Sequence, residues 1–342
     1  MPERKEGPAI LITGAAGFIG FHMADRLLKA GIAVHGVDSL NHYYDPALKT
    51  ARLVRLGKHA HFSFERVDVS DGPAVLRVFD AVRPRFVIHL AAQAGVRHSI
   101  DDPRAYTVAN IEGFLSVLEA CRQFPVDHLI YASSSSVYGA NATVPFSEHA
   151  PADHPVSLYA ATKRANELMA HAYAHLYGIR ATGLRFFTVY GPFGRPDMAY
   201  FKFTKAIFDG RPIDVYNEGR LSRDFTYVDD VTEAIQRLLD HPPQYDPSNQ
   251  AEPPDPARGA APHRLFNIGN HTPVALGDFI AVIENAVGRV AEKRFLPMQP
   301  GDVPATYAAV DDLAAAVGFT PKTTLEQGIA QFVGWYRSFY KV

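Results

Sequence analysis

The chain is poor in cysteine: Cys121 is the single one among 342 residues. This excludes an internal disulfide and favours a reducing compartment. Cys121 lies in the helical pattern FLSVLEACRQF, where we expect a small core residue. No apolar run approaches the roughly 18 residues needed to cross a bilayer, and the opening MPERKEGP is too short and too charged for a signal peptide. We therefore expect a cytoplasmic protein that makes no membrane contact.

An excess of positive charge is also missing, since 34 Lys and Arg stand against 36 Asp and Glu. Without a basic run interleaved with aromatic residues, nucleic acid is not an expected partner, and a small diffusible molecule is favoured. His171 and His175 have the i, i+4 spacing of some zinc sites. No glutamate follows the first histidine and no third ligand is evident, so we expect no metal.

Apolar residues make up 47% of the chain, which is ample for a large core. Short β-rich runs alternate with amphipathic helical stretches through the first half: AILIT, AVHGVD, FSFERVD, FVIHLA, HLIYASS and ATGLRFF. This alternation is typical of βαβ units. It predicts the α/β class, with a doubly wound parallel sheet of the Rossmann type.

The regular alternation fades after about residue 187. We expect residues 1–187 to form a dinucleotide-binding domain and residues 188–342 a smaller mixed α/β substrate lobe. Segments near 225–235 and 264–270 are expected to return to the first domain. Residues 242–263 contain seven prolines and few apolar residues, which predicts a mobile surface loop.

A glycine-rich turn, TGAAGFIG, follows the first expected strand and leads directly into a helical stretch. Glycines at the turn let a pyrophosphate approach the free N–H groups at the helix N-terminus. A bare glycine triplet is weak evidence, but this one has a strand before it and a helix after it. The turn therefore predicts a dinucleotide site that includes Gly14, Ala16, Gly17, Phe18, Ile19 and Gly20.

The ends of the next expected strands complete this site. Asp38 ends the second strand eighteen residues after Gly20, where a carboxylate binds the adenosine ribose and repels a 2′-phosphate, so NAD is favoured over NADP. Asp68 and Val69 end the third strand near the expected adenine, although Asp68 is almost as well explained as a helix cap. The fourth strand ends in HLAAQAG, whose Leu90, Ala91, Ala92 and Gln93 we expect beside the cofactor.

A tyrosine and a lysine four residues apart, Tyr159 and Lys163 in SLYAATK, share one helix face. The preceding strand carries Ser134 to the same sheet edge. A phenol with a pKa of about 10 is a poor base at neutral pH, but a neighbouring ammonium and a positive nicotinamide ring favour the phenolate. We expect these three side chains to carry out the proton transfer that accompanies hydride transfer at a carbinol carbon.

These motifs, TGAAGFIG, HLAAQAG, YASSSSVYG, YAATK and RFFTVYGP, resemble the extended short-chain dehydrogenase/reductase family over essentially the whole chain. Within that family, VYGPFGRPDMAYFKFTKAI, PIDVYNEG, RDFTYVDD and LPMQPGDV resemble the UDP-glucuronate 4-epimerases. The resemblance implies a homodimer with tightly held NAD⁺ that interconverts UDP-glucuronate and UDP-galacturonate. It also implies that Tyr159 is the general base, with Ser135 and Ser136 close to Ser134.

The same resemblance implies a set of substrate contacts. Arg195 would bind the uronate carboxylate, since guanidinium matches it at two points, although a surface role in the loop is the alternative. Thr188 would add a hydroxyl donor. The remaining implied contacts are Arg223 at the diphosphate, Asp302 at the uridine ribose, Val215, Tyr216 and Asn217 at the uracil, and Arg97 near the sugar or as a helix cap.

Three other functions stay open at this point. A UDP-glucuronate decarboxylase, or another UDP-hexose 4-epimerase, would share the oxidation step. A non-catalytic NAD-sensing protein would keep the fold, but such a protein has no need of both Tyr159 and Lys163.

Overall fold

The computed structural model describes residues 10–141, 143–249, 252–299 and 303–342. Its centre is a seven-stranded sheet in the order β10-β6-β5-β4-β1-β2-β3, with every neighbouring pair parallel. The predicted α/β class is therefore confirmed. The strands are β1 (Ile10–Thr13), β2 (Val34–Asp38), β3 (Phe62–Arg66), β4 (Phe86–His89), β5 (His128–Ser134), β6 (Ala181–Phe186) and β10 (His263–Ile268).

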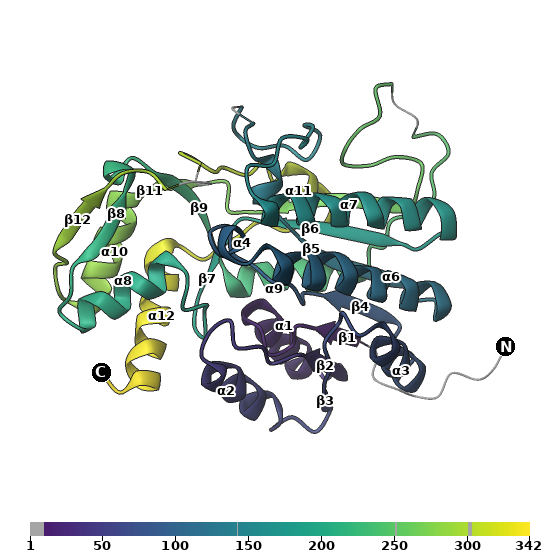
Figure 1. Ribbon diagram of the computed structural model, residues 1–342, viewed down its shortest axis with the longest axis horizontal. Coiled ribbons are helices and arrows are strands. Elements are labelled where there is room, and N and C mark those ends of the chain that lie inside the picture. The colour runs from purple at the N-terminus through teal and green to yellow at the C-terminus, as the bar shows by residue number, and fades with distance from the viewer. Residues whose placement is uncertain (1–9, 142, 250–251, 300–302) are drawn as a thin grey trace.

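Helices cover both faces of this sheet (Figure 1). One face carries a core with α1 (Phe18–Lys29), α2 (Pro46–Leu56), α9 (Val228–Leu239) and α11 (Asp311–Val317). The opposite face carries a second core with α3 (Gly72–Val82), α6 (Gly113–Gln123) and α7 (Leu158–Tyr177). Cys121 is buried in this second core, as predicted. The chain reaches α6 through α4 (His98–Asp101), α5 (Pro103–Tyr106) and a π-helical turn (Thr107–Glu112).

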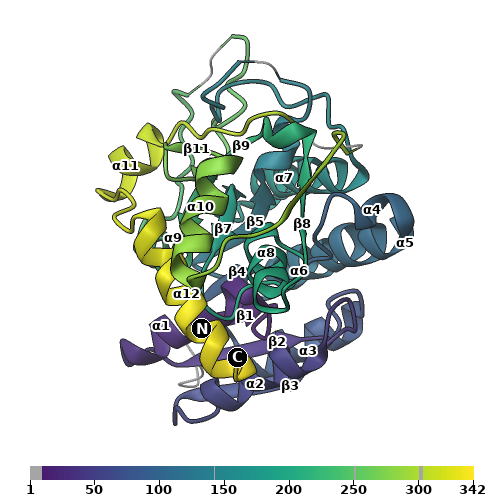
Figure 2. The same cartoon turned by 90° about the vertical axis from the view of Figure 1, so that its left-hand side faces the viewer.

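A smaller lobe lies at the carboxyl ends of the central strands, at the left of Figure 1 and facing the viewer in Figure 2. It contains a three-stranded sheet of β7 (Thr188–Tyr190), β9 (Ser222–Tyr227) and β11 (Pro273–Ala275), and the pair β8 (Ile213–Tyr216) and β12 (Lys293–Leu296). Three helices pack on these strands through an aromatic core: α8 (Ala199–Phe208), α10 (Leu276–Val287) and α12 (Leu325–Tyr340). Short 3₁₀ turns occupy Ser135–Tyr138 and Asn217–Gly219.

Later parts of the chain, among them β10 and α9, pack against the first part. β10 is the edge strand beside β6, and α9 packs on the same face of the sheet as α1. The predicted segment 225–235 begins in β9, and this strand lies in the three-stranded sheet of the lobe, not in the central sheet. The division at residue 187 stays a prediction.

The proline-rich segment 242–262 has no helix or strand among its described residues. It is nevertheless attached to the body, because Ala257 is buried and Asp255 accepts a hydrogen bond from His149 at 2.8 Å. The last predicted loop residue, His263, is instead the first residue of β10. None of the helices in the described ranges is both long and apolar enough to cross a bilayer.

Candidate active site

The glycine-rich turn between β1 and α1 approaches neighbouring backbone so closely that side chains are excluded. Gly14 has a φ of +73°, and a Cβ there would lie 2.7 Å from the amide nitrogen of Ala91. A Cβ on Gly20 would overlap the carbonyl oxygen of Gly14. Gly17 precedes the first residue of α1, so the helix begins at the cavity wall. This is the cradle that a pyrophosphate requires.

Asp38, at the end of β2, is buried beside this turn. Its carboxylate accepts hydrogen bonds from the amides of Ala16 at 3.2 Å and Leu40 at 2.8 Å. These bonds fix an acceptor at the position where a dinucleotide fold places the adenosine ribose. Ala16 itself is buried behind the turn, where its carbonyl oxygen accepts a bond from Arg52 at 2.7 Å.

One cavity of about 1260 Å³ joins the glycine turn to the lobe. The other predicted cofactor residues line it: Gly14, Gly17, Phe18, Ile19, Gly20, Asp38, Asp68, Val69, Leu90, Ala91, Ala92 and Gln93. Asp68 is not the N-terminal cap of α3, because Asp71 accepts the capping bond from Ala74 at 3.0 Å. Asp68 instead accepts the amide of Ser70 at 3.0 Å. The residues present therefore fit a dinucleotide.

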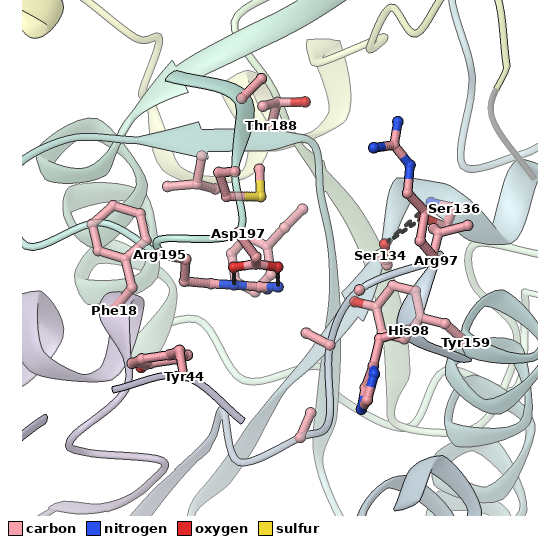
Figure 3. A pocket seen from close by; sticks show the side chains of 18 of the residues that line it. Phe18, Tyr44, Arg97, His98, Ser134, Ser136, Tyr159, Thr188, Arg195 and Asp197 are labelled. Carbon is pink, nitrogen blue, oxygen red and sulfur yellow. Dashed lines mark hydrogen bonds and ion pairs between the residues drawn. The ribbon is translucent and has the colours of Figure 1, made fainter. Parts of the chain in front are cut away.

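Tyr159 and Lys163 lie one turn apart at the start of α7, which Ser157 caps by accepting the amide of Ala160 at 3.1 Å. The hydroxyl of Tyr159 interacts with that of Ser134, which ends β5. Lys163 donates to the carbonyl oxygen of Ala132 at 2.9 Å. Strand β5 and helix α7 thus bring the phenol, the serine hydroxyl and the ammonium to one wall of the cavity. Figure 3 shows Tyr159 close to Ser134, whose Oγ lies 3.2 Å from that of Ser136; Ser135 lines the same wall.

Burial dominates the ionisation of these groups. It raises the pKa of Tyr159, whereas the hydrogen bond from Ser134 and the charge of Arg195 act to lower it. Burial lowers the pKa of Lys163 to about 8. The phenol of Tyr159 is therefore protonated when no cofactor is bound. Besides Lys163, which we expected to favour ionisation of the phenol, Arg195 is a second cation that does so.

Arg195 lines the opposite side of the cavity, in the loop before α8, and is only partly exposed. It is paired with a residue that the sequence patterns did not single out: its Nε donates to Asp197 at 3.0 Å and its Nη2 to the same carboxylate at 2.5 Å. The hydroxyl of Tyr43, from the loop after β2, donates to Asp197 at 3.2 Å. Arg195, which we expected to bind the uronate carboxylate, is thus already paired with a carboxylate of the chain itself, that of Asp197.

The other predicted substrate residues have different positions. Thr188, Arg97, Tyr216 and Arg223 line the cavity. The guanidinium of Arg97 lies 5.0 Å from the centre of the Tyr216 ring, and Arg223 donates to the carbonyl oxygen of Ser222 at 2.8 Å. Val215, within β8, is buried, and the side chain of Asn217 donates to the carbonyl oxygen of Arg220 at 2.7 Å. Asp302 lies outside the described residues.

Sequence patterns missed three further polar residues around the cavity. Asp197 had a possible signal, because a carboxylate two residues after a cavity arginine is a ready ion-pair partner. Lys49, which donates to the side-chain oxygen of Asn41 at 2.7 Å, and Tyr43 gave no comparable signal. Tyr43 lies in the loop after β2 and Lys49 in α2, which follows that loop, and no motif encodes the loop's path.

The parallel sheet, the glycine cradle and the Ser134, Tyr159 and Lys163 wall define a dinucleotide-dependent enzyme of the short-chain dehydrogenase/reductase type. Residues 10–251 match the model of the NAD dependent epimerase/dehydratase family. The chain belongs to this family, and NAD is its cofactor.

Two relatives and one solved structure are similar to the chain over almost its full length. It is 54% identical to Protein CapI of Staphylococcus aureus, covering 97% of this chain and 99% of the relative. It is 50% identical to a probable UDP-glucuronate 4-epimerase of Rhizobium meliloti, covering 97% of each. The crystal structure of UDP-glucuronic acid 4-epimerase from Bacillus cereus, in complex with UDP-glucuronic acid and NAD, superposes with a TM-score of 0.85. That match has 31% identity and covers 97% of this chain and 99% of the other.

Proposed function

We propose that the chain is a UDP-glucuronate 4-epimerase that interconverts UDP-glucuronate and UDP-galacturonate. One observation carries this proposal: a single cavity has Ser134, Tyr159 and Lys163 on one wall, beside the glycine cradle, and Arg195 on the other. The first set suits chemistry at a sugar hydroxyl, and the second suits a sugar that bears a carboxylate. The relatives named above support the same substrate.

In the proposed mechanism, Tyr159 removes the proton from the C4 hydroxyl while Ser134 donates a hydrogen bond to the same oxygen. Bound NAD supplies a hydride acceptor at C4 and returns the hydride later, so the net redox change is zero. Lys163 stabilises the phenolate by its charge. Its pKa of about 8 leaves it mostly protonated at neutral pH. After the 4-keto sugar turns over, its other face receives the hydride at C4, and Tyr159 returns the proton to the C4 oxygen.

The uridine diphosphate must stay bound while the sugar turns. Arg223 is proposed to hold the diphosphate, and Tyr216, under the guanidinium of Arg97, to flank the uracil side of the cavity. Both lie in or beside the lobe, away from the glycine cradle. Val215, Asn217 and Asp302 remain predicted contacts of the uridine.

The carboxylate imposes a further demand, since a 4-keto uronate is a β-keto acid. When the C5–C6 bond lies parallel to the carbonyl π system, the bond breaks, carbon dioxide leaves, and its electron pair passes into the C4 enolate. Protonation at C5 and return of the hydride then give a UDP-pentose. Arg195 and Thr188 are proposed to hold the carboxylate out of that orientation.

The function is tested by incubating the purified protein, with no added NAD, separately with UDP-glucuronate and with UDP-glucose, then identifying the products by NMR. We expect UDP-galacturonate, formed with cofactor that the protein retained. A UDP-pentose as the main product would identify a decarboxylase. Conversion of UDP-glucose alone would identify another hexose epimerase, and no conversion of either sugar would favour a non-catalytic NAD-binding protein.

The carboxylate assignment is tested with Arg195→Ala. We expect weaker binding of UDP-glucuronate and some UDP-pentose among the products, because the carboxylate is no longer held in place. Unchanged binding without any pentose would show that another group holds the carboxylate.

A homodimer is proposed through α6 and α7, which run side by side on the front face in Figure 1. Their outer surfaces expose Leu115, Leu168, Leu176 and Tyr177, with Leu168 58% and Leu176 65% exposed. Apolar side chains grouped on two adjacent helices are typical of an interface. Light scattering after size exclusion should show a dimer that Leu168→Glu dissociates, whereas Val290→Glu, at a more exposed site (84%) outside these helices, should leave it intact. The reducing compartment suggested by the buried Cys121 supports a cytoplasmic location.

A further inference from the structure

Asp197 pairs with only one edge of the Arg195 guanidinium. Asp197 binds the Nε and Nη2 side of Arg195, so a second carboxylate that binds through two bonds must use the Nη1 and Nη2 end. Both side chains are partly exposed to the cavity, by 23% for Arg195 and 26% for Asp197. Figure 3 shows the pair across the cavity from Ser134 and Tyr159.

Two loops of the dinucleotide-binding part hold this pair. Tyr43, after β2, donates to Asp197, and burial together with Asp197 raises the pKa of Tyr43 to about 12, which keeps its proton in place. Gly95, after β4, has a φ of +118°, and a Cβ there would lie 2.8 Å from the Tyr43 hydroxyl and 3.8 Å from Nη2 of Arg195. Tyr106 fixes Gly95 in turn by donating to its carbonyl oxygen at 2.6 Å.

The charge of Asp197 also acts on its surroundings. Burial acts to raise its pKa, but Arg195 outweighs burial and the pKa lies below its usual value, so Asp197 is ionised at neutral pH. The pair is therefore close to neutral overall, although Arg195 alone carries a full positive charge. A ligand carboxylate meets a guanidinium whose charge is already partly offset.

We propose that Asp197, held by Tyr43, is a specificity-determining positioning residue that fixes the guanidinium of Arg195 and limits its affinity for the sugar carboxylate. This inference rests on the proposed function. During epimerisation the sugar must turn over, and its carboxylate must leave or shift on Arg195. Asp197 keeps the guanidinium of Arg195 paired during that movement. Release of the substrate carboxylate therefore does not leave this partly buried cation without a counter-charge.

The test uses the NAD-loaded protein and equilibrium titration with UDP-glucuronate and, separately, with the uncharged analogue UDP-glucose. In Asp197→Asn, the Kd of UDP-glucuronate should fall about fivefold, the size of one partly exposed charge interaction, while that of UDP-glucose stays unchanged. The kcat for UDP-glucuronate should fall as well, because the carboxylate is released less readily. Asp80→Asn, which breaks the exposed pair with Arg83 on α3, is the matched control and should change none of these values.

Equal weakening of both sugars, or no change in either, would overturn the inference, because a merely structural residue does not discriminate by ligand charge. Tyr43→Phe keeps the Arg195 and Asp197 pair but removes the hydroxyl that holds it, and should give a smaller change of the same sign. This second variant tests the inference should Asp197→Asn fail to fold. Failure of the proposed function is seen separately, as absence of turnover by the unmodified protein.

Discussion

At the scale of single residues, burial works against the proposed base. Tyr159 is partly buried where it lines the cavity, and its pKa is raised despite the interaction with Ser134 and the nearby charge of Arg195. A phenol with a raised pKa needs additional positive charge before it accepts or releases protons near neutrality. The site therefore suits a base that becomes active when the cofactor is bound and remains protonated otherwise.

The first prediction concerns the phenol itself. Tyr159→Phe removes one oxygen and leaves the ring, which packs edge-on against Tyr106 with centroids 6.0 Å apart. We expect the kcat for UDP-glucuronate to fall by at least about 100-fold, because general acid–base catalysis contributes roughly that much, while the NAD content stays unchanged. Product formation and the NAD released on denaturation measure the two effects. Tyr245→Phe, at a residue 67% exposed, is the control, and wild-type turnover by Tyr159→Phe would remove the tyrosine from the mechanism.

At the scale of secondary-structure elements, one buried carboxylate joins the helix and strands that carry the catalytic wall. Glu167, one turn after Lys163 on α7, accepts bonds from Ser133 of β5 at 2.6 Å and from Arg185 of β6 at 2.8 Å. Arg185 is fully buried, and Glu167 is 1% exposed. Burial acts to raise the pKa of Glu167, but Arg185 and Ser133 outweigh it, and the pKa lies below its usual value. These bonds thus hold α7 against β5 and β6.

The second prediction follows from this pair. Glu167→Gln leaves the buried guanidinium of Arg185 without its counter-charge, so we expect the free energy of unfolding to fall by about 3–5 kcal/mol. Urea denaturation measures the loss. Because the folded pKa of Glu167 is depressed, its stabilisation is complete above the unfolded value of about 4.3 and is lost as pH falls through the folded pKa. The variant should lack that acid-dependent part, and equal stability at neutral pH would show that the pair is not structural.

At the scale of the whole molecule, His149 links three regions that are distant in sequence. One ring nitrogen bonds Asp255 of the proline-rich segment at 2.8 Å, and the other bonds Asp312 of α11 at 3.1 Å. Burial acts to lower the pKa of His149, but the two carboxylates raise it above its usual value. A protonated imidazole donates through both nitrogens, which is the form that this bridge requires.

The third prediction is a pH dependence of that attachment. Because the folded pKa of His149 is raised, the bridge stabilises fully below the unfolded value of about 6.5 and is lost as pH rises through the folded pKa. Limited proteolysis within residues 242–262 should therefore be slower at acidic than at alkaline pH. His149→Gln should cleave at the faster rate throughout, after correction for the protease's own pH profile measured on an unfolded substrate. The same pH dependence in the variant would exclude the histidine as its cause.

Much of the fold could be predicted because its first six strands are short apolar runs separated by helical patterns. The runs AILIT to ATGLRFF became β1 to β6 with ends within a few residues. The seventh strand was harder, since β10 begins 77 residues after β6 ends. Its pairing with β6 depends on the path of the intervening lobe. The short strands β7, β11 and β12 carry too few residues to show a period.

The features of the candidate site also divide into those that sequence motifs predicted and those that they could not predict. The glycine turn, Asp38, Ser134, Tyr159 and Lys163 were found because each belongs to a motif with fixed spacing to a strand or helix end. Their roles as cofactor and catalytic residues stay predictions, although they line one cavity. The contact of Tyr43 with Asp197 could not be predicted, because 154 residues separate them.

The sequence by itself determined the local features of this protein: the strand and helix periods, the glycines that admit backbone contact, and the tyrosine and lysine on one helix face. These follow from backbone sterics and residue spacing, which act over a few residues. The tertiary structure alone decided which distant charges meet, how far Tyr159 and Glu167 are removed from solvent, and that Tyr43 reaches the carboxylate paired with the cavity arginine. Such features depend on the packing of whole elements, since burial and Coulomb energies are set by neighbours in space.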